Sequence, residues 1–230
     1  MQEFSLKTAP EVTVNLRRSR RARRISLRVS SLDGKITLTM PPGTPARVGQ
    51  AFAEEKAAWL RRAVGNVLAP VPVVIGASLP IGGQDHLVTL GKGRAAAIKD
   101  GMIAAPAARE GPAVEALLKL LARERLSQSV TRYANRLGRT PGRLTLRDTR
   151  SRWGSCSSSG NLMFSWRLIM APVRVLDYVA AHEVAHLQHM DHSTAFWACV
   201  EDLFPDHKAE RVWLRQEGAT LHRFRFKKSD

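Results

Sequence analysis

The sequence predicts an α+β protein: a β-rich N-terminal part with one helix, followed by a half that combines a short sheet with a central helix. Three observations support this prediction. Apolar and polar residues alternate with a period of two in residues 12–40, a long helical pattern begins after residue 112, and an apolar helical segment surrounds residue 182. A change in composition near Pro106–Pro112 marks the expected boundary, so we divide the chain into residues 1–108 and 109–230.

In the N-terminal part, the alternation predicts half-buried strands over residues 12–16, 25–29 and 36–40. Leu32–Lys35 has the composition of a hairpin turn between the last two strands. A proline-rich segment then ends the sheet, and Pro45 begins a helix that continues to about Leu68. Gly-rich turns separate four shorter strands, which we expect near residues 79–81, 86–90, 95–99 and 102–105.

In the second part, a helical pattern from Val114 to Leu137 ends at Gly138, a residue type that commonly terminates helices. The remaining elements are expected in this order: strands at residues 144–147 and 161–165, a central helix from Pro172, a helix capped by Ser193, and a last helix from Pro205.

The segment Ser151–Cys156 connects the two short strands of this part. Trp153 followed by Gly154 predicts a tight packing turn. Arg152 is a candidate to contact a carboxylate or phosphate group of a substrate. Cys156 has no second cysteine close to it in the sequence, and we expect it to be a small buried residue rather than a nucleophile or metal ligand.

His182, Glu183 and His186 form the pattern His-Glu-x-x-His within the central helix. Helical positions four apart lie on one face, about 6 Å apart along the axis, so both imidazoles can bind one cation. The Glu183 carboxylate can reach a water bound to that cation. The surrounding apolar residues indicate a buried helix, in which unsatisfied polar side chains are costly. We therefore predict a Zn²⁺ hydrolase centre with Glu183 as the base, in preference to surface or satisfied core histidines.

The third ligand is predicted downstream, where His192 is favoured over His189. His189 is seven residues from His182, about 10 Å along a continuing helix, and cannot easily share an ion with it. His192 requires the chain to turn back, and Asp191 tolerates a left-handed backbone that ends a helix. The spacing from His186 to His192 also matches that of metzincin zinc proteases, which have Gly at the position of His189.

The net charge of +16 is concentrated early in the chain. A basic cluster can bind phosphates with strong salt dependence, so nucleic acid is a candidate partner. The alternative is a solvated strand edge that keeps the β-rich part soluble. No aromatic residues are interleaved with the arginines, so the cluster offers no stacking platform for single strands. The arginines of this cluster are Arg17, Arg18, Arg20, Arg21, Arg23 and Arg24.

Other features of the composition predict the compartment. The two cysteines, Cys156 and Cys199, imply no disulfide framework and suit a reducing environment. The N-terminus lacks the charged and apolar regions of a signal peptide. The most apolar window, residues 64–82, is interrupted by prolines and glycines and does not have the pattern of a membrane span. We expect a soluble, cytoplasmic protein without membrane contact.

Several segments together resemble the YgjP-like metallopeptidase family, which is related to the SprT-like and WLM metallopeptidases. The segments are Arg152–Cys156 (RWGSC), Trp166–Pro172 (WRLIMAP), Asp177–His186 (DYVAAHEVAH), His192-Ser193 and Phe196-Trp197. The N-terminal half resembles the family more loosely, so the likeness covers nearly the whole chain. It implies a zincin-like metallopeptidase domain, with His182, His186 and His192 as zinc ligands and Glu183 as the catalytic base. Asp191 and Ser165 stand where relatives commonly have Asn, and neither departure affects a ligand.

These observations favour a zinc-dependent metallopeptidase that hydrolyses a protein or peptide substrate through a metal-activated water. Two alternatives come from other classes. The first is a zinc-dependent hydrolase of a phosphate-containing small molecule such as a nucleotide, with Arg152 and the Arg17–Arg24 cluster binding phosphates. The second is a nucleic-acid-binding module with a structural metal site. Glu183 argues against the second, because a structural site needs no base and usually has four protein ligands.

Overall fold

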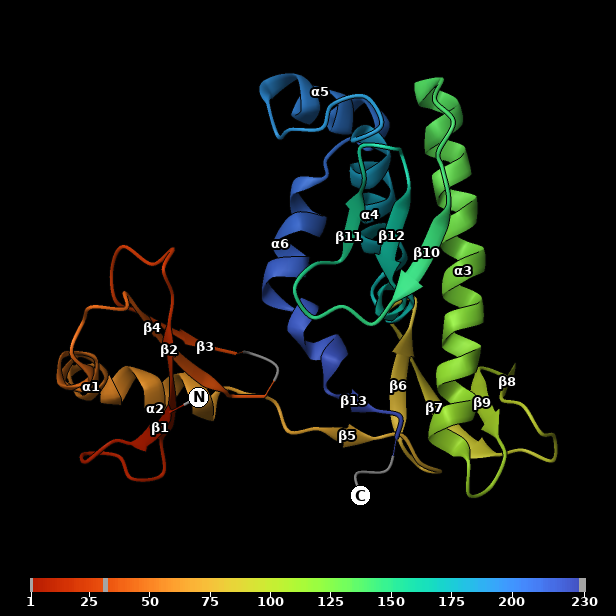
Figure 1. The fold of residues 1–230 in the computed structure, drawn as a ribbon. Helices are drawn as coiled ribbons and strands as arrows, with labels where there is room; N and C mark the ends of the chain where they lie inside the picture. Colours follow the sequence, from red (N-terminus) through yellow and green to blue (C-terminus); the bar gives the residue numbers. More distant parts are fainter. Residues whose placement is uncertain (1, 31–32, 228–230) are drawn as a thin grey trace. The chain divides into compact units, whose positions relative to one another are not determined.

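The computed structural model of the protein describes residues 2–30 and 33–227 (Figure 1). The chain divides into two compact units, Met1–Ala69 and Pro70–Asp230. This division lies upstream of the boundary expected from composition at residues 108 and 109. The physical reason is that Ile103, before the expected boundary, and Val114, after it, are fully buried in one hydrophobic core. Helices and small sheets occur in both units, which confirms the predicted α+β class.

Unit 1 (Met1–Ala69) is a mixed four-stranded sheet with the order β1-β2-β4-β3. Strands β2 and β4 are parallel, and the two outer pairs are antiparallel. The elements are β1 (Gln2–Ser5), β2 (Thr13–Arg18), β3 (Ser26–Val29), β4 (Ile36–Met40), α1 (Ala46–Glu55) and α2 (Ala57–Gly65). The turn expected at Leu32–Lys35 is described in part: Gly34 has a φ of +69°, and Leu32 lies outside the described residues.

One face of this sheet is covered by helices. Val14 and Leu38 are fully buried in the unit's core together with Leu60 of α2. A side chain at Gly49 would place its Cβ 2.9 Å from Cδ2 of Leu38, so this glycine lets α1 pack closely on β4. The single helix predicted here is two helices, because Lys56 leaves the helical conformation at φ −95° and ψ 9°.

Unit 2 (Pro70–Asp230) contains three sheets, with the strand orders β6-β7-β9-β8, β10-β12-β11 and β13-β5. Its strands are β5 (Val71–Pro72), β6 (Ser78–Ile81), β7 (Gln84–Leu90), β8 (Ala97–Lys99), β9 (Met102–Ala105), β10 (Leu144–Arg147), β11 (Gly154–Cys156), β12 (Leu162–Ser165) and β13 (Phe224–Arg225). Its helices are α3 (Glu110–Leu137), α4 (Val173–Ala185), α5 (Thr194–Leu203) and α6 (Lys208–Gln216), with 3-10 helices η1 (Trp166–Met170) and η2 (Gly218–His222).

Helix α4 is the centre of unit 2. It packs against α3, α5, α6 and β11, and Figure 1 shows α3 running beside this helix and the β10-β12-β11 sheet. Ala180, Ala181 and Val184 are fully buried, as the apolar sequence around residue 182 predicts. Gly138 ends α3 in the left-handed conformation, also as predicted. Within residues 2–30 and 33–227, no helix has the length and apolarity needed to cross a membrane.

Candidate metal centre

Three histidine rings meet beyond the C-terminal end of α4. His182 lies in the last turn of this helix, and His186 immediately follows it with an α-helical backbone. His192 comes from the connection to α5. One potential ligand nitrogen from each ring can be chosen so that all three lie within 4.8 Å of one another. Among the His, Cys, Asp and Glu side chains of the described residues, these three histidines form the group that could hold a metal ion.

The distance between two of the rings fits a tetrahedral metal ion. Nε2 of His182 and Nε2 of His192 are 3.2 Å apart. Two nitrogen ligands bound at 2.0–2.1 Å with tetrahedral angles are about 3.3 Å apart. Burial lowers the pKa of His182 to about 3, and the neighbouring His186 and His192 add to this effect. The His182 ring is therefore neutral at neutral pH and has a lone pair available for a cation.

His189 contributes to the centre through its backbone. Nδ1 of His186 donates a hydrogen bond to the carbonyl oxygen of His189 at 2.9 Å, which leaves Nε2 of His186 to face the cluster. Such hydrogen bonds fix the tautomer and orientation of metal-binding histidines. The His189 ring is outside the three-histidine group.

The connection after α4 turns back by a different local structure from the one predicted. Asp191 is absent from the described residues that have a positive φ, so it does not end the helix in a left-handed conformation. Its Oδ1 instead accepts a hydrogen bond from the backbone N–H of Ser193 at 3.2 Å. Ser193 in turn caps α5, as predicted, by accepting from the N–H of Phe196. Side-chain hydrogen bonding of this kind is a common turn mechanism for Asp.

Aromatic side chains of α5 hold the histidines in place. Phe196 is fully buried and stacks on His186 with ring centroids 4.5 Å apart. The same ring contacts His182 edge-on at 4.9 Å. Trp197 lies 5.8 Å from the His192 ring. These contacts restrict ring rotation, and they explain why the aromatic side chains in the first turn of α5 belong to the site.

Glu183 directly follows His182 in α4 and is 5% exposed. Burial raises the pKa of its carboxyl to about 8, although the Arg152 guanidinium acts in the opposite direction. A bound cation would lower this value, because a nearby positive charge favours the ionised form. Oε2 of Glu183 is buried without a hydrogen-bond partner among the described residues. The described residues therefore leave the hydrogen-bonding capacity of this oxygen unsatisfied.

The segment that packs beside Glu183 is a strand that the sequence does not predict. β11 occupies Gly154–Cys156, where we expected a turn, and it packs along α4. Its three residues are too few to show a period-two pattern. Arg152, just before it, is exposed, and Cys156 is partly buried with a thiol pKa raised by burial and by Glu183. Neither belongs to the histidine cluster.

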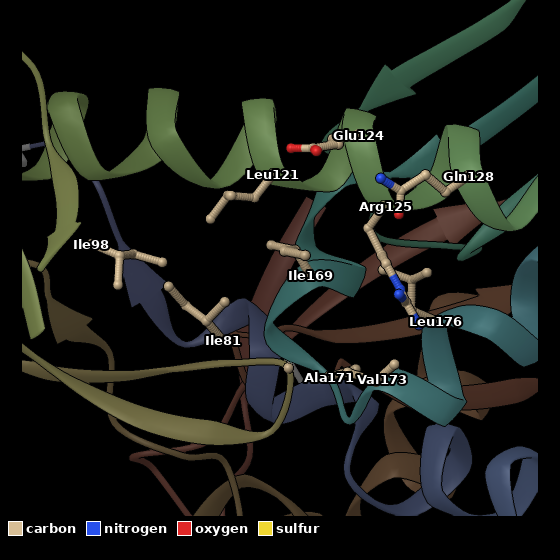
Figure 2. A pocket seen from close by; sticks show the side chains of 11 residues that line it. Ile81, Ile98, Leu121, Glu124, Arg125, Gln128, Ile169, Ala171, Val173 and Leu176 are labelled. Atoms are coloured by element: carbon tan, nitrogen blue, oxygen red, sulfur yellow. The ribbon is translucent and has the colours of Figure 1, made fainter. Parts of the chain in front are cut away.

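A separate cavity of about 290 Å³ lies at the other end of α4 (Figure 2). Glu124, Arg125 and Gln128 of α3 are the polar residues that line it. Its apolar lining residues are Ile81, Ile98, Leu121, Ile169, Val173 and Leu176. The cavity includes none of the histidines of the cluster and is distinct from the metal centre.

A three-histidine group at the end of a helix that also carries a buried glutamate is a site of the kind used by metal-dependent hydrolases. The model of the YgjP-like metallopeptidase domain matches residues 23–217 of the chain. The protein therefore belongs to the YgjP-like metallopeptidase family, as its motifs indicate, and is a metal-dependent peptidase. The matched region includes most of unit 1, so the family domain is not confined to residues 109–230.

Other comparisons add little to the family match. The metallopeptidase zymogen abylysin from Pyrococcus abyssi, a solved structure, is 22% identical with a TM-score of 0.36. The similarity covers 40% of this chain and 95% of that chain. No curated protein sequence matches the chain. The assignment to a class of enzyme rests on the family model.

Proposed function

We propose that the metal is zinc, that His182, His186 and His192 hold it, and that Glu183 is the general base of peptide hydrolysis. The observation that carries this proposal is the convergence of three ring nitrogens within 4.8 Å, with the buried Glu183 directly following His182 in α4. Nitrogen ligands in a tetrahedral arrangement are typical of zinc, and three protein ligands leave a position for water. A structural zinc site usually has a fourth protein ligand, so the three-histidine group favours catalysis.

In the proposed peptide hydrolysis, each residue of the centre would have a distinct role. A bound zinc ion polarises a carbonyl oxygen and lowers the pKa of a bound water. Glu183 accepts a proton on a carboxylate oxygen and returns it to the leaving amine. Phe196 keeps the His186 ring in its orientation. The hydrogen bond from His186 to the His189 carbonyl directs the other ring nitrogen into the centre.

The edge strand β11 supports an extended peptide as the substrate. Among the described strands, β11 pairs with β12 alone, and it packs against the helix that carries Glu183. An edge strand has unpaired N–H and C=O groups that can bind an extended chain by adding a strand. The exposed Arg152 precedes this strand and is placed to contact a carboxylate of such a peptide.

The substitution Glu183→Gln tests this proposal. We expect the variant to bind one zinc ion per chain and to lose hydrolysis of fluorescein-labelled casein by roughly 10²- to 10⁴-fold, the usual contribution of a general base. Zinc content by atomic absorption and release of labelled peptides are the two measurements. Full activity in the variant would contradict the role of Glu183.

Two other assays separate the alternative functions. Metal-dependent release of phosphate from nucleoside triphosphates, without cleavage of casein, would favour the phosphate hydrolase. The binding module with a structural metal would be favoured by two results together: Glu183→Gln binds nucleic acid as well as the wild type does, and neither protein hydrolyses a substrate. The family match favours the peptidase over both.

We also propose that the Arg17–Arg24 cluster of unit 1 contacts nucleic acid. All six of its arginines are exposed. The Arg18 side chain donates hydrogen bonds to the carbonyl oxygens of Pro42 and Thr44. Within the described ranges, the side chains of the other five arginines have no hydrogen-bond or ion-pair partner. Unpaired guanidinium groups suit phosphate binding. A cytoplasmic location fits Cys156 and Cys199, which are free thiols.

A further inference from the structure

Gly154 of β11 lies in direct contact with the Glu183 side chain. A Cβ built on Gly154 would lie 2.5 Å from Oε1, 2.6 Å from Cγ and 2.8 Å from Cδ of Glu183. All three distances are shorter than non-bonded carbon contacts allow. Gly154 is not among the described glycines with a positive φ, so its backbone conformation does not require glycine. The space occupied by Glu183 is what excludes a side chain at position 154.

Glu183 has little room to move away from this contact. Its side chain is almost fully buried, and Oε2 is enclosed by protein atoms. Its backbone lies in the last turn of α4, next to His182. A methyl group at position 154 would therefore displace the carboxyl group relative to the three histidines, because a packed interior does not absorb such a clash without movement.

Trp153, the residue before Gly154, anchors β11 through its backbone and its ring. The Trp153 carbonyl accepts a hydrogen bond from the Ser165 N–H of β12 at 2.8 Å. The Trp153 ring packs on His222 of η2 with centroids 5.2 Å apart. A Cβ on Gly218, at the start of η2, would lie 3.0 Å from Cζ2 of Trp153. The C-terminal segment thus holds Trp153, and Trp153 holds the backbone that contacts Glu183.

We infer that the Trp153–Gly154 step positions the Glu183 carboxyl group, with Gly154 as the surface against which it rests and Trp153 as the anchor. This assigns a role to the Arg-Trp-Gly-Ser-Cys segment that the metal site leaves unexplained. The inference rests on the proposed function of Glu183 as the general base. Gly154 and Trp153 are positioning residues, since neither touches the metal-binding nitrogens.

A stability cycle tests the contact without any assay of catalysis. Gly154→Ala, Glu183→Ala and the double variant are compared with the wild type by thermal unfolding of the full chain. We expect Gly154→Ala to lower the Tm by roughly 3 to 10 °C when Glu183 is present. With Glu183→Ala the clashing atoms are absent, so the second substitution should change the Tm by less than about 2 °C.

The same cycle remains decisive if Gly154→Ala does not fold. Folding should then return in the Gly154→Ala/Glu183→Ala double variant. Equal loss of stability in both backgrounds, or failure of the double variant to fold, would overturn the inference. Gly91→Ala is the matched control: its Cβ would lie 3.0 Å from the Ala104 backbone, away from Glu183. Its effect on the Tm should be independent of residue 183.

A kinetic comparison tests the consequence for hydrolysis of labelled casein. Gly154→Ala should retain zinc, lower kcat by roughly 100-fold and change KM by less than about 2-fold, since small misplacements of a catalytic group act on turnover. Gly91→Ala, whose Cβ would meet the Ala104 backbone instead of Glu183, should lower kcat by less than about 2-fold. An equal loss of kcat in Gly91→Ala and Gly154→Ala would overturn the positioning role. A wild type without any activity would contradict the proposed function, and the stability cycle would still decide the contact.

Discussion

At the scale of single residues, the metal centre depends on which nitrogen each histidine presents. The spacing of His182 and His186 predicts that their rings share one helical face, and the structure places His192 beside them with its Nε2 3.2 Å from that of His182. His189 has a different role, because its carbonyl oxygen accepts the hydrogen bond from His186. A backbone carbonyl is supplied by any residue type, so no side-chain motif signals this contact.

This difference leads to a prediction for two alanine variants. His192→Ala should weaken zinc binding by more than about 100-fold, because it removes a proposed ligand. This loss is larger than the roughly 10- to 100-fold typical of residues that only support ligands. His189→Ala should change the affinity by less than about 3-fold, because its carbonyl remains. Competition with a fluorescent zinc chelator measures both affinities.

His192→Ala and His189→Ala control for each other, because each removes one histidine from the connection between α4 and α5. Thermal unfolding in the presence of chelator checks that neither substitution changes the stability of the metal-free chain. Loss of zinc in His189→Ala and retention in His192→Ala would reverse the assignment of the third ligand.

At the scale of elements, a buried carboxylate joins α3 to the metal helix. Asp177 of α4 accepts a hydrogen bond from Oγ of Ser129 at 2.6 Å and pairs with Nη2 of Arg125 and of Arg132, both at 3.1 Å. All three partners belong to α3. Since His182 follows five residues later on α4, this network fixes the helix that presents the site.

We predict that Asp177→Ala destabilises the protein by about 2–4 kcal/mol. The reason is that removal of one partner leaves the other groups of a largely buried network unpaired, and the partial exposure of the arginines reduces the cost below that of a fully buried pair. Urea denaturation measures the change. Glu115→Ala is the control, because it breaks the partly exposed i,i+4 pair with Lys119 on α3 and should cost less than about 0.5 kcal/mol. Equal effects of the two substitutions would contradict the role of the network.

Elements with long periodic patterns are predictable from the sequence, and short ones are not. Gly138 marks the end of α3, and Ser193 marks the start of α5, because each residue type has a specific capping geometry. β11 has no such signal. A three-residue edge strand is defined by its pairing with β12, and the residues within β11 do not reveal that pairing. The break at Lys56 is unpredictable for a related reason: the bend lets two helices face one sheet, a tertiary requirement without a local signal.

The same distinction applies to the site. Spacing within one helix identifies His182, Glu183 and His186 as candidates, because helical geometry alone brings them together. The contact between Gly154 and Glu183 depends on the packing of β11 against α4. A glycine without a positive φ has no local reason to be glycine, and only the packed structure provides one.

At the scale of the whole molecule, the net charge of +16 favours attraction to polyanions, independently of the proposed peptide substrate. Part of this charge is the Arg17–Arg24 cluster, which belongs to unit 1, whereas the histidine centre belongs to unit 2. Substitutions in the cluster should therefore affect phosphate binding without removing a zinc ligand. This separation allows binding and hydrolysis to be measured independently.

We predict that the full chain binds duplex DNA with a steep dependence on salt. The quadruple variant Arg20→Ser, Arg21→Ser, Arg23→Ser and Arg24→Ser should reduce the slope of log K against log salt by about 0.9 for each phosphate that is no longer neutralised, so by up to about 3.6 units. Fluorescence anisotropy with a labelled duplex of random sequence, titrated at several salt concentrations, measures the slope. Zinc content and casein hydrolysis should remain within about 2-fold of the wild type, because none of the four arginines is one of the three histidines or Glu183.

A charge-matched control distinguishes a specific surface from general attraction to a basic protein. Substituting Arg47, Arg62, Lys92 and Lys99 by Ser removes the same charge from exposed positions outside the cluster. If the cluster is the binding surface, this control should retain most of the salt slope, because all six arginines of the cluster remain. An equal reduction of the slope in both variants would mean that binding follows net charge, and the cluster would then be a solvated edge of the unit 1 sheet rather than a nucleic-acid-binding surface.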